Sequence, residues 1–344
     1  MSKDRVTIKD IAKTAGVSVG TVSKFLNGGS GIKESNRARI QKAIEDMNYT
    51  ANSVARMLAH NPICLGVILP SDFGTYFDSL LDGIKARVDS LSDHKVTAIY
   101  GRYVDYNDSE KIEEILSAFF SRKVDGIIMA PSVSTDNSAI LKRLKTSNIP
   151  IVSIISKITD LTCVGHVMVD TFLSGEKAAD MAELVLNKGE TAAVFTGSLS
   201  IPEHREKVES FLLHCARNGV RVSETIEAHE DLEAAYNSAC RLMKDERNVR
   251  FLYVTTANSL SICKAIEDMG RIGEVKMMVT DVLPGMKEYA EKGVIVAALD
   301  QHMHRQGELA VDILYSYLTD SQIGTVTEST DRSVVPGLLL RTGI

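Results

Sequence analysis

Hydroxyl, amide and amino side chains gather in one short stretch near the start of the chain, residues 6–27, which reads VTIKDIAKTAGVSVGTVSKFLN. Short polar side chains can hydrogen-bond to the phosphate oxygens of DNA, and a lysine can donate to O6 and N7 of guanine. The candidates for such contacts are Thr7, Ser18, Thr21, Ser23, Lys24 and Asn27.

The same stretch predicts two short helices that would position these side chains. Thr7 is placed to cap the first helix and Ser18 the second, and Gly16 falls where the chain must turn between them. This is the spacing of a helix-turn-helix, although a small helical core that never contacts DNA has the same spacing. The expected inward-facing residues are Ile8, Ile11, Ala12, Val22, Phe25 and Leu26.

Charge is unevenly distributed along the chain. Residues 1–60 hold ten Lys/Arg and five Asp/Glu, a net charge of +5, whereas the rest of the chain has a net charge of −11, which together give the overall −6. A basic segment on an acidic body indicates a nucleic-acid-binding part attached to a part with another role.

The chain has 344 residues, too many for one hydrophobic core, which predicts two or three compact units. No apolar run is long enough to span a bilayer, and residues 1–10 lack the apolar core of a signal peptide, so we expect a cytoplasmic protein. The five cysteines and eight histidines show no metal-ligand spacing, so neither a metal site nor a disulfide is expected.

From residue 63 onward, short apolar runs alternate with amphipathic segments, which predicts parallel strands covered by helices on both faces. About ten strands exceed the needs of one ordinary sheet, so the expected fold is a small all-α head followed by an α/β body with two doubly wound parallel-sheet lobes. The predicted strands are Cys64–Leu69, Lys95–Tyr100, Gly126–Ala130, Ile151–Ile155, Val167–Val169, Ala192–Thr196, Arg221–Ile226, Phe251–Thr255, Lys276–Thr280 and Val294–Leu299.

Motifs of nucleotide enzymes are missing from the body. No G-x-G-x-x-G follows the first predicted strand, and no G-x-x-x-x-G-K-S/T occurs in the sequence. We therefore expect neither an enzyme nor a bound cofactor.

The run T-I-K-D-I-A-K-T-A-G-V-S-V-G-T-V-S-K-F-L-N closely resembles the N-terminal signature of the LacI/GalR family of transcription regulators. The remaining chain resembles the effector domain of that family, which is shared with periplasmic sugar-binding proteins. This implies a helix-turn-helix DNA-binding domain at 1–50, a hinge helix or linker at 51–61, and a two-lobed effector-binding and dimerisation domain at 62–344. The expected N-lobe covers about 62–160 plus 293–322, and the expected C-lobe about 161–292 plus 323–344.

The resemblance assigns base reading to Val19, Gly20 and Lys24, with the short polar residues named above on phosphates. It also makes Leu58 an apolar wedge in the minor groove of a palindromic operator bound by a homodimer, with Asn52 and Arg56 as further DNA contacts. A plain linker helix is the alternative for this hinge segment.

For the effector, the resemblance implies a cleft between the lobes at the carboxyl ends of the strands. A sugar or polyol needs apolar faces and bidentate hydrogen-bonding groups there. Asp281 is a site position on geometry alone, because it follows a predicted strand. The full set of residues matching the cleft is Tyr76, Phe77, Ser132, Lys157, Lys207, Asn258, Asp281 and Gln301.

Several of these matches leave alternatives open. Tyr76 and Phe77 could be core aromatics, and Arg205 could face the cleft in place of Lys207. Ser259, Val282 and Lys207 each replace a bidentate group of the family pattern. A regulator that answers to a protein partner or a phosphorylated metabolite is therefore the main alternative, and a solute-binding protein or enzyme with an incidental helical head is the more distant one.

Overall fold

The computed structural model describes residues 6–26, 31–47, 61–71, 75–104, 109–130, 138–158, 161–229, 231–320 and 330–344. No helix in these ranges is long and apolar enough to cross a membrane.

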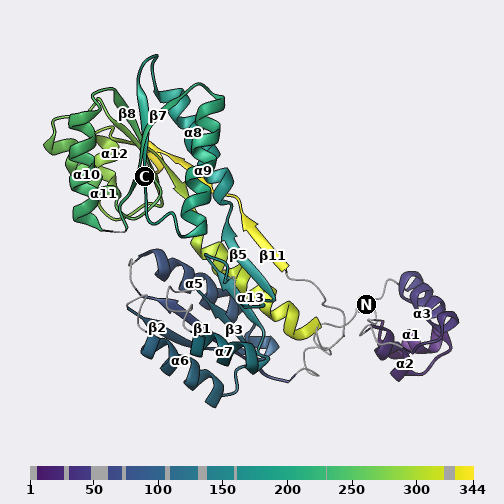
Figure 1. Ribbon diagram of the computed structural model, residues 1–344. Coiled ribbons are helices and arrows are strands. Elements are labelled where there is room, and N and C mark those ends of the chain that lie inside the picture. The colour runs from purple at the N-terminus through teal and green to yellow at the C-terminus, as the bar shows by residue number, and fades with distance from the viewer. Residues whose placement is uncertain are drawn as a thin grey trace.

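The head is a three-helix unit of α1 (Ile8–Ala15), α2 (Val19–Leu26) and α3 (Glu34–Asp46) (Figure 1). The predicted start and end of α1 are confirmed: Thr7 and Asp10 form a reciprocal capping box, and Gly16 ends the helix with a φ of 63°. Lys33 precedes α3 without a side-chain cap. The core closes on the predicted faces, with buried Ile11, Ala12, Ala15, Val22, Ile40 and Ala43.

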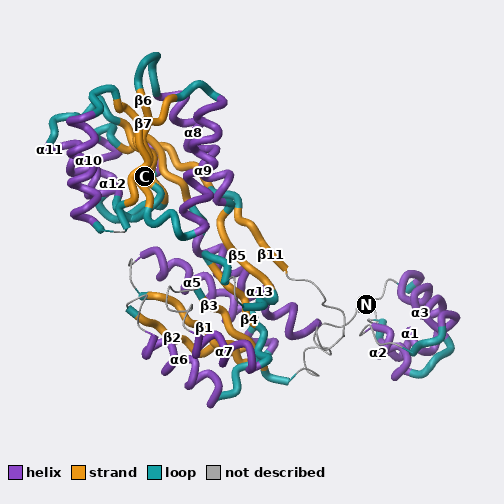
Figure 2. Tube along the Cα trace, in the orientation of Figure 1, coloured by secondary structure: helices purple, strands orange, loops and turns teal. Residues whose placement is uncertain are grey.

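The first lobe is built on a six-stranded sheet in the order β11-β5-β4-β3-β1-β2, in which all neighbours are parallel. Figure 2 shows both sheets of the body (orange) lying between helices (purple). In this lobe, α5 and α13 pack on one face and α6 on the other. The elements are β1 (Ile63–Pro70), α5 (Thr75–Ser90), η1 (Ser92–His94), β2 (Val96–Tyr103), α6 (Ser109–Ser121), β3 (Gly126–Met129), α7 (Ser138–Ser147), β4 (Ile151–Ile154), β5 (Gly165–Val169), α13 (Met303–Asp320) and β11 (Thr330–Val334).

The second lobe has a six-stranded sheet in the order β12-β10-β9-β8-β6-β7, parallel except for the antiparallel pair β10 and β12. Helices α8 and α9 cover one face, and α10, α11 and α12 cover the other (Figure 1). The elements are α8 (Thr171–Val185), β6 (Thr191–Thr196), α9 (Pro202–Arg217), β7 (Arg221–Glu227), α10 (Leu232–Asp245), β8 (Val249–Val254), α11 (Ser259–Asp268), β9 (Lys276–Thr280), α12 (Met286–Glu291), β10 (Ile295–Asp300), β12 (Gly337–Leu340) and η4 (Arg341–Gly343).

The chain crosses between the sheets at positions that differ from the expected lobe limits. It leaves the first sheet after β5 rather than near residue 160, because β5 pairs with β4 and β11. It returns only after β10, which pairs with β9 in the second sheet, and crosses a third time between β11 and β12. Strands β11 and β12 were not predicted, and each adds one edge to a different lobe.

Glycines let the helices of the first lobe approach closely. A Cβ on Gly83 of α5 would collide with the backbone of His304, and a Cβ on Gly307 of α13 would collide with the carbonyl oxygen of Leu80. The two helices therefore meet backbone to backbone, which fixes α13 and the crossover segment just before it.

We expect Gly307→Ala to destabilise the protein, because the added methyl group must push α13 away from α5. Overpacking of this kind costs about 1–3 kcal/mol, which corresponds to a fall in melting temperature of roughly 2–10 °C. Gly343→Ala is the matched control, since the atoms nearest to its added Cβ lie 3.8 Å away. Equal melting temperatures for the two variants in a thermal unfolding experiment would contradict this packing.

Candidate functional sites

Helix α2 of the head presents a small, exposed surface at its N-terminal end. Ser18 accepts a hydrogen bond from the backbone N–H of Thr21 at 3.1 Å and pairs with its hydroxyl group at 2.8 Å, so the predicted cap of this helix is present. Val19 is 42% exposed, and Gly20 and Lys24 are exposed as well. The three residues assigned to base reading are therefore open to solvent on a helix that is capped and backed by the head's core.

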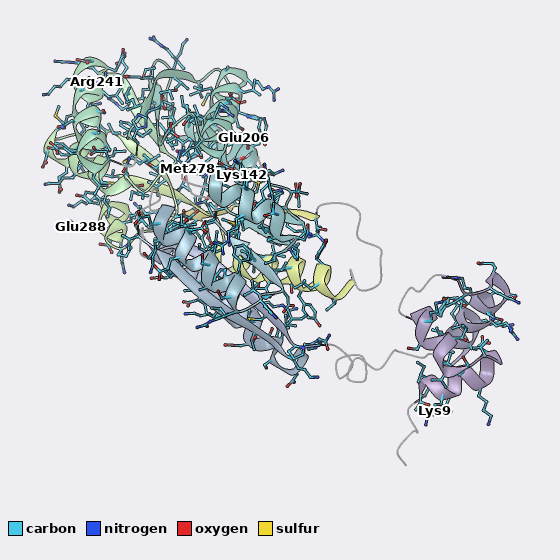
Figure 3. The ribbon with its side chains drawn as sticks, turned by 60° about the horizontal axis from the view of Figure 1, so that its bottom comes forward. Lys9, Lys142, Glu206, Arg241, Met278 and Glu288 are labelled. Atoms are coloured by element: carbon cyan, nitrogen blue, oxygen red, sulfur yellow. The ribbon has the colours of Figure 1, made fainter. Side chains whose placement is uncertain are left out.

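The side chains of the other DNA-binding candidates differ in burial and in the hydrogen bonds that they already make. The hydroxyl group of Thr7 donates to Asp10 at 2.6 Å, so its donor already serves the helix cap. Ser23 is half-buried. Lys9, which was not among the candidates, lies on α1 of the same head and is labelled in Figure 3. Four candidates lie outside the described residues: Asn27, Asn52, Arg56 and Leu58.

In the body, Gln301 joins side chains from several elements where the chain leaves β10 for the first lobe. Its Nε2 donates to Oδ2 of Asp281 at 2.6 Å and lies 3.5 Å from the hydroxyl group of Tyr76 on α5. Its Oε1 accepts from Nζ of Lys207 on α9 at 3.2 Å. Gln301 and Lys207 are 6% and 5% exposed. Four residues predicted from sequence thus lie together between the second lobe and α5 of the first.

Asp281 is held in an unusual state directly after β9. Its φ of 62° is left-handed, which aspartate tolerates better than most residues. Burial raises the pKa of its carboxyl group to about 6, against the opposing effects of the hydrogen bonds from Gln301 and the charge of Lys207. A carboxyl group of this kind can accept or donate a hydrogen bond near neutral pH.

Among the predicted cleft residues, Asn258 has the side chain that most clearly indicates ligand binding. It is 0% exposed at the start of α11, and neither its Nδ2 nor its Oδ1 has a hydrogen-bond partner among the residues that the structure describes. A buried amide without partners costs about 1–3 kcal/mol per group. An unpaired amide at the carboxyl end of a central strand is suited to recognise a ligand that brings both a donor and an acceptor.

The structure resolves the choice between Lys207 and Arg205. Helix α9 begins at Pro202, and in this register Lys207 faces inward, whereas Arg205 is exposed and donates to the carbonyl oxygen of Leu199. Gly175 of α8 fixes the position of α9, because a Cβ there would collide with the backbone of Lys207.

The remaining effector candidates do not all join the cluster around Gln301. Phe77 is 1% exposed and belongs to the core of the first lobe, its ring 5.0 Å from that of Tyr76, as the alternative interpretation allowed. Lys157 points its half-exposed side chain to Asp331, with Nζ and Oδ2 3.0 Å apart. Ser132 lies outside the described residues.

Three further polar residues at this site were not predicted. Gln306 donates to the carbonyl oxygen of Gln301 at 2.9 Å and so holds the crossover segment. Glu203 is 9% exposed, and burial together with the charge of Lys207 lowers the pKa of His204 to about 4. The spacing of Glu203 and Lys207, four residues apart on one helix, was the available sequence signal.

Two parallel-sheet lobes, joined by three crossovers and carrying polar side chains at their carboxyl ends, define the class of periplasmic binding protein folds. Residues 65–322 match the family model described as periplasmic binding protein domain, and residues 7–52 match bacterial regulatory proteins of the lacI family. The chain therefore belongs to the family of periplasmic binding protein domains over residues 65–322 and carries a lacI-family domain at residues 7–52, as the resemblance of its first residues implied.

Relatives and solved structures agree with this assignment. Catabolite control protein A of Staphylococcus epidermidis is 25% identical over 324 residues, covering 92% of this chain and 94% of that protein. The transcriptional regulator DegA of Bacillus subtilis is 27% identical over 79% of each chain. A lac repressor dimer bound to operator and an anti-inducer has the same fold over 99% of both chains, with a TM-score of 0.64 and 18% identity. The glucose-galactose binding protein GanP of Geobacillus stearothermophilus covers 83% of this chain and 99% of its own, with a TM-score of 0.69 and 22% identity.

We expect the stability of the wild-type protein relative to Asp281→Asn to fall as the pH rises. The pKa of Asp281 is raised from 3.8 to about 6, so the folded state holds the proton more tightly than the unfolded state. The stabilisation is complete below pH 3.8 and is lost by about pH 6, with a total of at most about 3 kcal/mol. Melting temperatures of both proteins between pH 4 and 8 measure this difference.

Asp93→Asn, at an exposed position of η1, is the matched control for replacing a carboxyl group by an amide. A difference between wild type and Asp281→Asn that stays flat, or that grows with pH, would show that burial does not raise the pKa of this carboxyl group.

Proposed function

We propose that this chain is a homodimeric repressor of transcription that binds a palindromic operator through its head and responds to a neutral sugar or polyol. The observation that carries the DNA-binding part is the exposed surface of α2, where Val19, Gly20 and Lys24 stand beside a capped turn. The net charge of +5 on residues 1–60 supports it, because a basic surface attracts the phosphate backbone.

In this proposal Lys24 reads guanine, Val19 packs on a thymine methyl group and Gly20 permits close approach. Leu58 inserts at a central base step and kinks the operator, with Asn52 and Arg56 contacting the groove or backbone beside it. The protein acts in the cytoplasm, and it carries out no catalysis.

The cleft favours a neutral effector over a phosphorylated one. Beside Gln301, the buried cation Lys207 already donates to that amide, and the Asp281 carboxyl group accepts from it. A phosphate dianion there would have to be buried near the Asp281 carboxyl group, which carries a charge of the same sign above about pH 6. Hydroxyl groups instead match the unpaired amide of Asn258, the Asp281 carboxyl group and the Tyr76 hydroxyl group. The glucose-galactose binding protein GanP, which has this fold, supports the same class of ligand.

We expect Lys24→Ala to weaken binding to the cognate operator by about 1–3 kcal/mol for each half-site, because a lost base contact costs this much, or roughly 5- to 150-fold in affinity for each half-site. The operator is first obtained by selecting bound DNA from a random library, in which the proposal expects a palindrome. The same selection with the variant should lose its base preference at one position in each half-site.

Lys42→Ala, at an exposed position of α3, is the matched control for the loss of positive charge. It should leave the selected sequence unchanged. If the full-length protein enriches no palindrome, or binds DNA without a steep dependence on salt, the chain is not an operator-binding regulator.

We expect a neutral sugar or polyol to raise the melting temperature in a thermal-shift screen, with sugar phosphates giving no shift. At a ligand concentration 100 times Kd the stabilisation is about 2.7 kcal/mol. Asn258→Ala should remove this shift while leaving the melting temperature of the unliganded protein unchanged or higher, because it removes a buried amide that has no partner among the described residues.

Other outcomes of the screen assign the alternatives. Stabilisation only by sugar phosphates would favour a phosphorylated metabolite, and stabilisation by none of the compounds would favour a protein partner as the signal. An unliganded Asn258→Ala that melts several degrees below wild type would place the amide in the protein's own hydrogen bonding.

A further inference from the structure

A carboxylate at the start of α9 bonds to the backbone of the opposite lobe. Glu203, 9% exposed, is the second residue of α9 in the second lobe, and its Oε1 accepts a hydrogen bond from the backbone N–H of Lys157 at 3.3 Å. Lys157 follows β4 of the first lobe. This bond therefore spans the two lobes away from the three covalent crossovers.

The loop that receives this carboxylate is itself tightly held. Ile155, the first residue after β4, has a φ of 76°, which is a strained conformation for a β-branched residue, and its N–H donates to the carbonyl oxygen of Val167 at 2.8 Å. The side chain of Lys157 bonds to Asp331 on β11. Lys157 thus contacts the second lobe through its backbone N–H. Its side chain contacts β11, the strand that precedes the third crossover.

The third crossover is also fixed from the second lobe. Nζ of Lys177 on α8 donates to the carbonyl oxygen of Pro336 at 2.6 Å. Lys157 therefore contacts β11 ahead of this crossover, and Lys177 contacts the crossover segment itself.

We propose that Glu203 is a positioning residue that sets the spacing of the two lobes at the effector cleft. It lies one helical turn before Lys207, so the bond to Lys157 places the helix that presents Lys207 to Gln301. The inference rests on the proposed cleft for its consequence, but the bond itself requires neither an effector nor DNA.

Hydrogen exchange of the Lys157 amide in the full chain tests this inference. Glu203→Ala removes the acceptor, and we expect exchange of that amide to accelerate about tenfold. Glu203→Gln keeps an acceptor oxygen without the charge and should restore most of the protection. Glu206→Ala is the matched control, because Glu206, labelled on α9 in Figure 3, accepts instead from Thr171 of its own lobe at 2.5 Å.

The proposal fails if Lys157 exchanges in Glu203→Ala within twofold of wild type, or if Glu206→Ala accelerates the same amide equally. If the alanine variant does not fold, Glu203→Met provides a side chain of similar length with no oxygen acceptor, with the same expected result. Since no sugar or operator is present, a negative result here leaves the proposed function standing, and failure of the ligand screen leaves this bond standing.

Discussion

The hydrogen bond between Gln301 and Asp281 is the constraint on which the arrangement of the cleft depends. Gln301 lies where the chain leaves the second sheet, so whatever orients its side chain also orients the path into α13. Asp281 accepts hydrogen bonds from the side-chain NH2 group of Gln301 and, at 3.4 Å, from its backbone N–H. The side-chain oxygen of Gln301 accepts from Lys207. A single amide at a covalent crossover therefore fixes the relation between a carboxyl group, an ammonium group and a tyrosine from the first lobe.

Backbone packing makes this constraint rigid. The glycine contacts between α5 and α13 hold the first-lobe side of the crossover, and Gly175 holds α9 against α8 on the other side. Because helices that meet backbone to backbone cannot slide without collision, motion between the lobes is confined to the crossovers and to the contacts that span them. The cleft residues are thus carried by two stiff bodies rather than by independent loops.

The fold and part of the site could be predicted from the sequence because they depend on local patterns. Each predicted strand overlaps an observed one, since buried parallel strands are short continuous apolar runs. Strand β11 was missed because its residues TDRSV form no apolar run, and β12 because its apolar run, GLLL, has only four residues and lies at the edge of a sheet. Strand β10 was expected in the first lobe but pairs with β9 in the second, because strand pairing depends on residues far apart in the sequence. Glu203 was missed for the same reason: its partner is a backbone N–H 46 residues earlier in the chain.

The free-energy cost carried by Asp281 and Asn258 gives a ligand at these residues a means of acting on the head in the proposed function. Asp281 is kept in a left-handed conformation with a raised pKa, and Asn258 is buried without partners among the described residues, so the protein carries a cost that a ligand's hydroxyl groups can relieve. Only the part of this relief that differs between two arrangements of the lobes can shift their populations. A typical coupling of about 1–3 kcal/mol is within reach of a single buried amide. In the proposed function this coupling is reciprocal, so DNA bound at the head alters the affinity for the effector by the same factor.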